Sequence, residues 1–178
     1  MGLKEQLRVI QEQYGNTKQG LDEGVKAIVA AVTMSLKVKP DEVALLVLTT
    51  TGNTLKFVWP EPLYKSNAVL PAMHKNAVAS AVLQARKGKV DNRMAESRHL
   101  KFFENVKGLE TSGVPIQKMV ALPVMVGDNP IGVVEVSRKG RTAEEAGPNF
   151  TPEDAQKLLA LAKEFAAGLA ALVPQPFI

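Results

Sequence analysis

The feature that most constrains the fold is a pair of apolar stretches joined by a short turn. Residues 116–126 and 131–139 are rich in Val, Ile and Met, and the connection 127–130 consists of Gly, Asp, Asn and Pro. These four residue types favour a tight reversal of the chain, so the pattern predicts an antiparallel β-hairpin. Because this is the most apolar part of the sequence, we expect the hairpin to lie at the centre of a sheet.

Two further strands are predicted earlier in the chain. Residues 43–50 are apolar at almost every position, which indicates a central strand that is covered on both faces. After a turn, residues 54–59 are expected to pair back against this strand. Side chains alternate along a strand, so Leu55, Phe57 and Trp59 should share one face.

The middle of the chain is predicted to consist of short elements and loops. We expect an irregular connection over 60–75 and then a helix over 77–87, for which Asn76 can serve as the N-cap. A short strand at 89–92 and a second short helix at 99–106 should follow.

Both ends of the chain carry helical patterns. Apolar residues spaced three and four apart over 2–37 predict either one long helix or two helices that meet near Gly15 and Asn16. Near the other end, Thr151 is a natural N-cap and Pro152 fits the first position of a helix. The apolar seams of these helices could pack on the sheet of the same chain or on a second subunit, and we expect a homodimer through the terminal helices.

The order of elements predicts an α+β fold. It has a central antiparallel β-sheet, with the N- and C-terminal helices on one face and short helices and loops covering a pocket on the other. Three segments are expected: an N-terminal helical segment over 1–40 for dimerisation or packing on the sheet, a main domain over 41–173, and a tail over 174–178.

Composition excludes several classes of function. The sequence has no apolar run long enough to span a bilayer and no apolar signal core, so we expect a cytoplasmic protein without membrane contact. It has no cysteine, which removes disulfides, thiolate metal sites and thiol nucleophiles. The two histidines, His74 and His99, lie far apart in the sequence, so neither a metal site nor a catalytic site is predicted.

Basic residues gather in one segment. Residues 86–107 hold seven basic and three acidic residues, an excess that equals the net charge of +4 of the whole chain. Binders of duplex nucleic acid cluster Lys and Arg more strongly than this, so nucleic acid is not the expected partner. A cleft that concentrates a small anion fits the segment at least as well.

Glu135 is the polar exception in the most apolar strand, where it shares one face with Ser137. A buried carboxylate needs a partner, because an unpaired charge costs several kcal/mol. Arg93 or Arg98 could supply that partner. The pair would be either a polar anchor in a ligand pocket or a structural ion pair that ties the basic segment to the sheet. Glu135 could also be exposed.

Three aromatic residues complete the candidate site. Trp59, Phe102 and Phe103 could line the same cavity and stack on a planar ligand, or they could simply form part of the core. The sequence identifies no cofactor.

Several segments resemble GAF domains in their order and spacing. Residues 120–124, 130–139 and 149–154 are similar to the second half of such a domain, and 81–91 are similar to its middle. The resemblance covers about residues 40–173. It implies a sensory or regulatory module with a profilin-like layout, which binds small molecules on one face of the sheet and often dimerises through helices on the other.

The sequence departs from the members of that family that bind cyclic nucleotides. Ser137 and Arg138 stand where the resemblance implies an Asn-Lys pair, and Ala155 replaces a Glu, whereas Phe150 and Asp154 match. These departures argue against a cyclic nucleotide as the ligand. They also suggest an ion pair between Arg138 and Asp154.

The resemblance therefore implies a binding module. Bilin-carrying members and the GAF-type methionine sulfoxide reductases use cysteines, and this chain has none, so we expect that it is not an enzyme. The main hypothesis is a stand-alone homodimeric module that binds a small anionic or planar molecule and signals through a separate partner. The alternative is a non-catalytic scaffold or dimerisation module with a filled pocket, which acts through protein partners.

Overall fold

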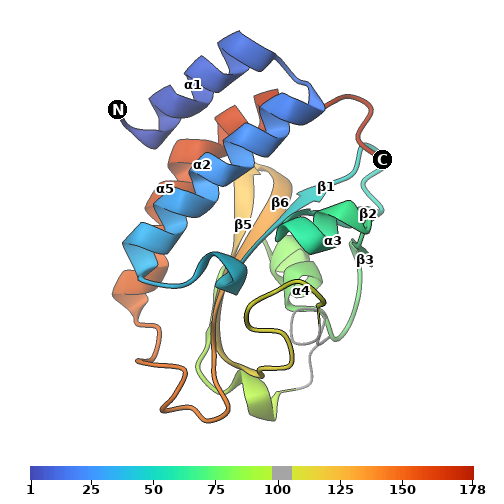
Figure 1. The fold of residues 1–178 in the computed structure, drawn as a ribbon. Coiled ribbons are helices and arrows are strands. Elements are labelled where there is room, and N and C mark those ends of the chain that lie inside the picture. The colour runs from blue at the N-terminus through green and yellow to red at the C-terminus, as the bar shows by residue number, and fades with distance from the viewer. Residues whose placement is uncertain (98–105) are drawn as a thin grey trace.

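The computed structural model describes residues 1–97 and 106–178, which fold around one six-stranded antiparallel sheet (Figure 1). The strand order is β3-β2-β1-β6-β5-β4. The strands are β1 (Val43–Leu48), β2 (Thr54–Trp59), β3 (Val69–Pro71), β4 (Lys89–Asp91), β5 (Ile116–Val126) and β6 (Asn129–Lys139). Helices flank this sheet, so the predicted α+β class is confirmed.

The predicted hairpin, β5 and β6, lies inside the sheet. Its register runs from Ile116 opposite Lys139 to Val126 opposite Asn129, and the other edge of β6 pairs with β1. The closest approach is at Gly132, where a Cβ atom would lie 2.1 Å from the carbonyl oxygen of Leu46. The backbones of β1 and β6 can pack this closely only because this position has no side chain.

Helices α1 (Leu3–Tyr14), α2 (Lys18–Leu36) and α5 (Pro152–Leu172) gather on one face of the sheet (Figure 1). The N-terminal helical pattern is broken, as one of the two alternatives predicted. Gly15 ends α1 with a φ of 62°, and the side chain of Thr17 caps α2 by accepting a hydrogen bond from the Gly20 N–H.

The start of α5 has the capping chemistry that its sequence predicts. The Thr151 hydroxyl accepts a hydrogen bond from the Asp154 N–H at 3.1 Å, and the Asp154 carboxylate accepts one from the Thr151 N–H at 2.9 Å. The apolar seam of α5 is fully buried at Leu158, Phe165 and Leu169 within the core between sheet and helices. The seam therefore packs within its own chain.

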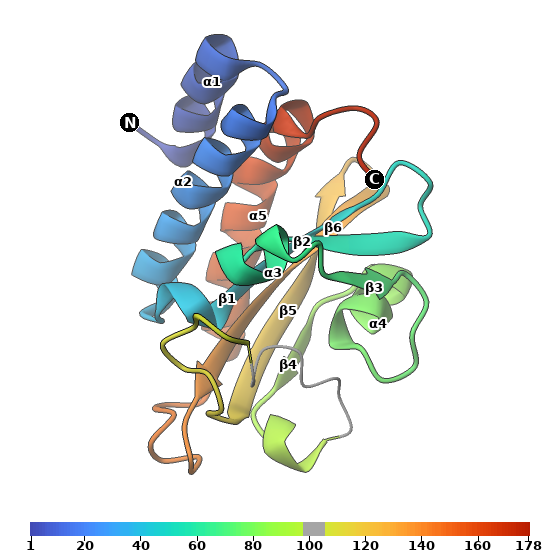
Figure 2. The same cartoon turned by 45° about the vertical axis from the view of Figure 1, so that its right-hand side comes forward.

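The other face of the sheet carries α4 (Val78–Ala85) and the 3₁₀ turn η2 (Met94–Glu96), while α3 (Glu61–Lys65) lies beside β2 (Figure 2). A second 3₁₀ turn, η1 (Pro40–Glu42), leads into β1. A separate apolar cluster fills the sheet face that carries α4. Its largest fully buried members include Leu46, Leu55, Phe57, Met94 and Ile116.

The segment after β2 is more regular than its sequence predicts. The connection over 60–75 contains both α3 and β3. Its Pro, Ser and Asn residues are typical of irregular structure, so the sequence pattern does not indicate these two elements. Helix α4 is shorter than the predicted 77–87, and its N-cap is Ala77 without a side-chain hydrogen bond, so the prediction of an Asn76 cap is wrong. The helix predicted over 99–106 lies almost entirely outside the described residues.

Trp59 does not share a face with Leu55 and Phe57. The β1–β2 register shifts by one residue, because Leu45 pairs with Trp59 whereas Leu46 pairs with Phe57. This irregularity places both Val58 and Trp59 against the cluster on the helix side of the sheet. A strict period of two fails wherever a strand accommodates an extra residue.

Among the residues that the structure describes, no helix is both long and apolar enough to cross a membrane.

Candidate functional site

Strand β6 positions Glu135 on the sheet face that carries α4. Val134 and Val136 point into the helix-side cluster, whereas Val133 belongs to the cluster on the opposite face, and Glu135 alternates with the two valines beside it. The residues paired with Glu135 are Ala44 in β1 and Ala121 in β5. These small neighbours leave room for a carboxyl group that is only 5% exposed.

Burial controls the protonation of Glu135. Desolvation raises the pKa of the carboxyl from 4.5 to about 7, and a hydrogen bond from the backbone N–H of Ala79, in the first turn of α4, offsets part of this rise. No cationic side chain among the described residues forms an ion pair with Glu135. The carboxyl group therefore exchanges its proton near neutral pH.

Of the two arginines predicted as partners of Glu135, only Arg93 lies within the described residues, and it does not pair with Glu135. Arg93 pairs with Glu96 at 2.6 Å, and both side chains are largely exposed, so the prediction that Arg93 could pair with Glu135 is wrong. The reason is local, because η2 brings Glu96 within reach of Arg93. Arg98, Phe102 and Phe103 lie outside the described residues.

The other two predicted site residues are separated by the sheet. Ser137 does accompany Glu135, and its hydroxyl donates a hydrogen bond to the carbonyl oxygen of Glu42 at 3.2 Å. Trp59 lies on the helix side instead, where its indole Nε1 donates to the carbonyl oxygen of Pro40 at 2.8 Å. Trp59 is therefore not part of the Glu135 site.

Sequence reasoning missed Asp41, which lines the same narrow cavity as Glu135 and Ser137. The Asp41 Oδ2 atom accepts hydrogen bonds from the backbone N–H and the hydroxyl of Thr111, at 3.0 and 2.9 Å. Its Oδ1 atom is buried and has no hydrogen-bond partner. The cavity is too small to admit a water molecule. Asp41 follows a proline in a helix-to-strand connection, and nothing in that pattern signals a buried acceptor.

Arg138 has a structural role. Its Nη1 donates to the carbonyl oxygen of Pro148 at 2.9 Å, its Nη2 donates to that of Leu36 at 3.1 Å, and its guanidinium lies 4.6 Å from the ring centre of Phe150. Asp154 caps α5 instead, so the suggested Arg138–Asp154 ion pair is wrong. Arg138 thus fastens the loop before α5 to the end of α2.

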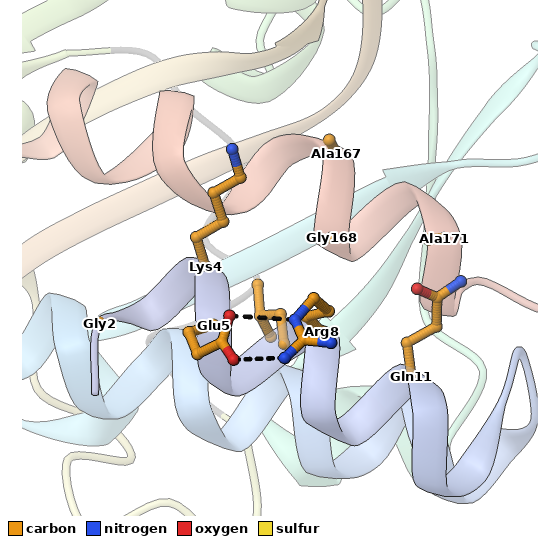
Figure 3. Close-up of a pocket in the computed structure, with 9 residues that line it drawn as sticks. Gly2, Lys4, Glu5, Arg8, Gln11, Ala167, Gly168 and Ala171 are labelled. Atoms are coloured by element: carbon orange, nitrogen blue, oxygen red, sulfur yellow. Dashed lines mark hydrogen bonds and ion pairs between the residues drawn. The ribbon is translucent and has the colours of Figure 1, made fainter.

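Larger hollows lie elsewhere on the described surface, among them a groove and a cleft. A groove of about 430 Å³ runs between α1 and α5 (Figure 3), where Glu5 and Arg8 lie side by side and pair with each other. A cleft of about 300 Å³ lies between α2, β2 and α3 and contains Trp59. No group of three or more His, Asp or Glu side chains in the described ranges is arranged to hold a metal ion.

Comparison with known proteins identifies the architecture. No protein-family model matches the sequence, and no curated protein matches it. A GAF domain from an Acinetobacter phosphoenolpyruvate-protein phosphotransferase superposes with a TM-score of 0.63 at 16% identity, over 93% of this chain and 91% of that one. This chain has a GAF fold. A segment of a methyl-accepting chemotaxis protein superposes with a TM-score of 0.67 at 14% identity, over 96% of both chains.

The GAF fold also occurs in enzymes, which corrects one prediction. A free methionine-R-sulfoxide reductase from Neisseria meningitidis superposes with a TM-score of 0.56 at 15% identity, over 96% of this chain and 89% of that one. This neighbour contradicts the expectation that the chain is not an enzyme, which rested on the absence of a cysteine nucleophile and of a metal-binding set. The fold alone does not separate binding modules from enzymes. Any catalysis here would proceed without a cysteine thiol.

The raised pKa of Glu135 predicts how stability depends on pH. Folded protein keeps the proton up to about pH 7, whereas the unfolded chain loses it near pH 4.5. The free energy of unfolding should therefore decrease between these two pH values, by about 3 kcal/mol, and Glu135 should cause no further loss above them.

Urea denaturation of wild type and Glu135→Gln across this range measures the effect. The variant should gain about 3 kcal/mol relative to wild type as the pH rises, while the exposed-site control Glu144→Gln should track the wild type. Parallel curves for wild type and Glu135→Gln would show that Glu135 titrates normally.

Proposed function

We propose that this protein is a sensory or regulatory module that binds a small molecule on the sheet face that carries Glu135. The observation that carries the proposal is a carboxyl group buried in an apolar face without a cationic partner among the described residues. A structural carboxylate in such a place is ordinarily paired. A ligand that provides the missing partner would explain why the position is polar.

The chemistry of the face favours a ligand with hydrogen-bond donors. Glu135 can accept once it is ionised, and the buried Oδ1 atom of Asp41 is an unused acceptor beside the same cavity. An amino or ammonium group satisfies both kinds of oxygen. This changes the expected ligand from an anion to an amine, because Arg93, the one predicted arginine partner within the described residues, pairs with Glu96 instead.

Access to Glu135 requires movement. The space between Asp41, Met119 and Glu135 does not admit a water molecule, so a ligand reaches the carboxyl only when a lining element shifts. Coupling of binding to such a shift is what a sensory module needs, because a ligand changes a conformation only through its preference for one state.

A second candidate function rests on the packing of this face. Leu46, Phe57, Met94 and Ile116 are all fully buried there and occupy the space with the protein's own side chains. A scaffold or dimerisation module with a filled pocket, which acts through protein partners, is consistent with that packing.

A thermal-shift and calorimetry panel separates the two candidates. It should contain amines, amidines, amino acids, aminopurines and aromatic acids. An amine-bearing compound at 100 times its dissociation constant should add about 2.7 kcal/mol to the free energy of unfolding. At pH 6.5 its binding should release most of one proton, because the ligand cation lowers the pKa of Glu135.

The control for that experiment is a pair of amide variants. Glu135→Gln should weaken binding at least about tenfold and abolish proton release, whereas Glu144→Gln should change neither. A panel in which no amine stabilises the protein would contradict the ligand proposal and favour the filled-pocket module.

We also propose that the protein forms a homodimer through its helix layer. The apolar seams of α2 and α5 are used within the chain, so the interface needs another surface. The outer surface of α2 and α5 offers one, because Met34 is 81% exposed there and lines a shallow groove with Ala30, Ala31 and Leu161. Exposed apolar surface of this kind favours association.

Light scattering tests the dimer. Met34→Glu should convert a wild-type dimer into monomers, because two desolvated carboxylates would face each other across a symmetric contact. Val126→Glu, at an exposed apolar position on the tip of the hairpin, should leave the dimer intact. A monomeric wild type at micromolar concentration would exclude the proposal.

A further inference from the structure

The cleft that contains Trp59 is a second concave site, separate from Glu135. It lies on the helix side of the sheet, between α2, the end of β2 and α3, and has a volume of about 300 Å³. Trp59 and Tyr64 contribute its two aromatic rings, and Val25 and Val58 contribute the apolar floor. This volume is at the lower end of those that hold small ligands, so it suits a single ring with a short substituent.

The Trp59 indole is held in place by the protein. Its Nε1 donates a hydrogen bond to the carbonyl oxygen of Pro40 at 2.8 Å, which fixes the ring without involving the cleft. A fixed ring can stack on a planar ligand with little loss of side-chain entropy. The bulge at Val58 places this tryptophan on the helix side, so the position of the cleft follows from a specific irregularity of the sheet.

Tyr64 provides the second ring and a hydroxyl group. Burial raises the pKa of this hydroxyl above its ordinary value, and the negative charge of Asp22 adds to the rise, so it stays protonated. No described group forms a hydrogen bond with it. The hydroxyl is therefore available as a donor at the mouth of the cleft.

The charges around the cleft favour an anion. Three ammonium groups line it, from Lys18, Lys26 and Lys65, against two carboxylates, from Asp22 and Glu61. All three lysines lower the pKa of Glu61, so their fields converge on its carboxylate. Each lysine has an acidic partner: Asp22 for Lys18 and Glu61 for Lys65 line the cleft, whereas Glu23, the partner of Lys26, does not.

A ligand carboxylate could replace the carboxylate of Glu61 as the partner of these lysines. The Glu61 side chain is 61% exposed, and its ion pair with Lys65, at 2.7 Å, joins two exposed groups on one short helix. Such pairs contribute little to stability and rearrange readily. A ligand carboxylate could take its place among the lysines, and the ligand ring would displace the Lys18 ammonium group, which lies 5.4 Å from the centre of the Tyr64 ring.

We propose that this cleft binds a small aromatic carboxylate, with the ring against Trp59 and Tyr64 and the carboxylate among Lys18, Lys26 and Lys65. The site is independent of the proposed function at Glu135, which lies on the other face of the sheet. Aromatic walls alone would accept any flat molecule. The three ammonium groups and the Tyr64 hydroxyl select for the acid.

A charge series of probes tests the proposal on the full chain. Phenylacetate, benzyl alcohol and benzylammonium carry similar rings with negative, zero and positive charge. Trp59 is the only tryptophan, so its fluorescence reports occupancy of the cleft directly. Phenylacetate should bind about tenfold more tightly than benzylammonium, should change the fluorescence of Trp59, and should bind more weakly as salt is added.

Variants locate the binding site. Lys26→Gln should weaken phenylacetate binding several-fold, whereas Lys157→Gln, which removes a comparable helical ion pair with Glu153 on α5, should not. Tyr64→Leu should weaken it about fivefold through loss of ring stacking. Glu135→Gln should have no effect on phenylacetate, which separates this site from the one on the other face.

Three results would overturn the proposal. The first is an equal or stronger affinity for benzylammonium, the second is no binding of phenylacetate at millimolar concentration, and the third is binding that neither alters Trp59 fluorescence nor responds to Lys26→Gln. The third remains decisive even where Tyr64→Leu fails to fold, because Lys26 is an exposed surface residue.

Discussion

Strand β6, which lies inside the sheet, buries a carboxyl group among apolar side chains. Every residue from Gly132 to Gly140 is buried, because β6 lies between two strands and between two layers of packing. Glu135 fits only because Ala44 and Ala121 flank it and an α4 N–H reaches it. Below about pH 7 the carboxyl is protonated and neutral, so it can stay buried without the cationic partner that an ionised carboxylate would need.

The sheet separates two kinds of surface. Its helix side is covered by α2 and α5, on which α1 packs as an outer layer, yet a one-residue bulge at Val58 places Trp59 in an open cleft on this side. Its other side is filled by apolar side chains except around Glu135, which accepts the Ala79 N–H, and Asp41, whose buried Oδ1 atom has no donor in the described part of the chain. One concave site is therefore aromatic and basic, and the other is narrow and acidic. They would recognise different molecules.

Local chemistry made much of this fold predictable. The hairpin, the cap of α5 at Thr151 and the helix break at Gly15 depend on neighbouring residues, and all are present, although the turn of the hairpin is confined to residues 127–128 because β6 already begins at Asn129. The predictions that failed concern features that depend on tertiary contacts. Trp59 lies on the face opposite to the predicted one, because a bulge depends on how two strands pair. Arg93 pairs with Glu96, three residues away, and not with Glu135. The orphaned acceptor of Asp41 arises only once Thr111 packs against it.

The pKa of Glu135 can be measured directly from the chemical shift of its side-chain carboxyl carbon in an NMR pH titration of the folded protein. The midpoint should lie at about 7, because burial raises the pKa of this carboxyl from its ordinary value of 4.5. A midpoint near the ordinary value would contradict this expectation, because the carboxyl would then be solvated or paired with a cation and would need no ligand to complete it.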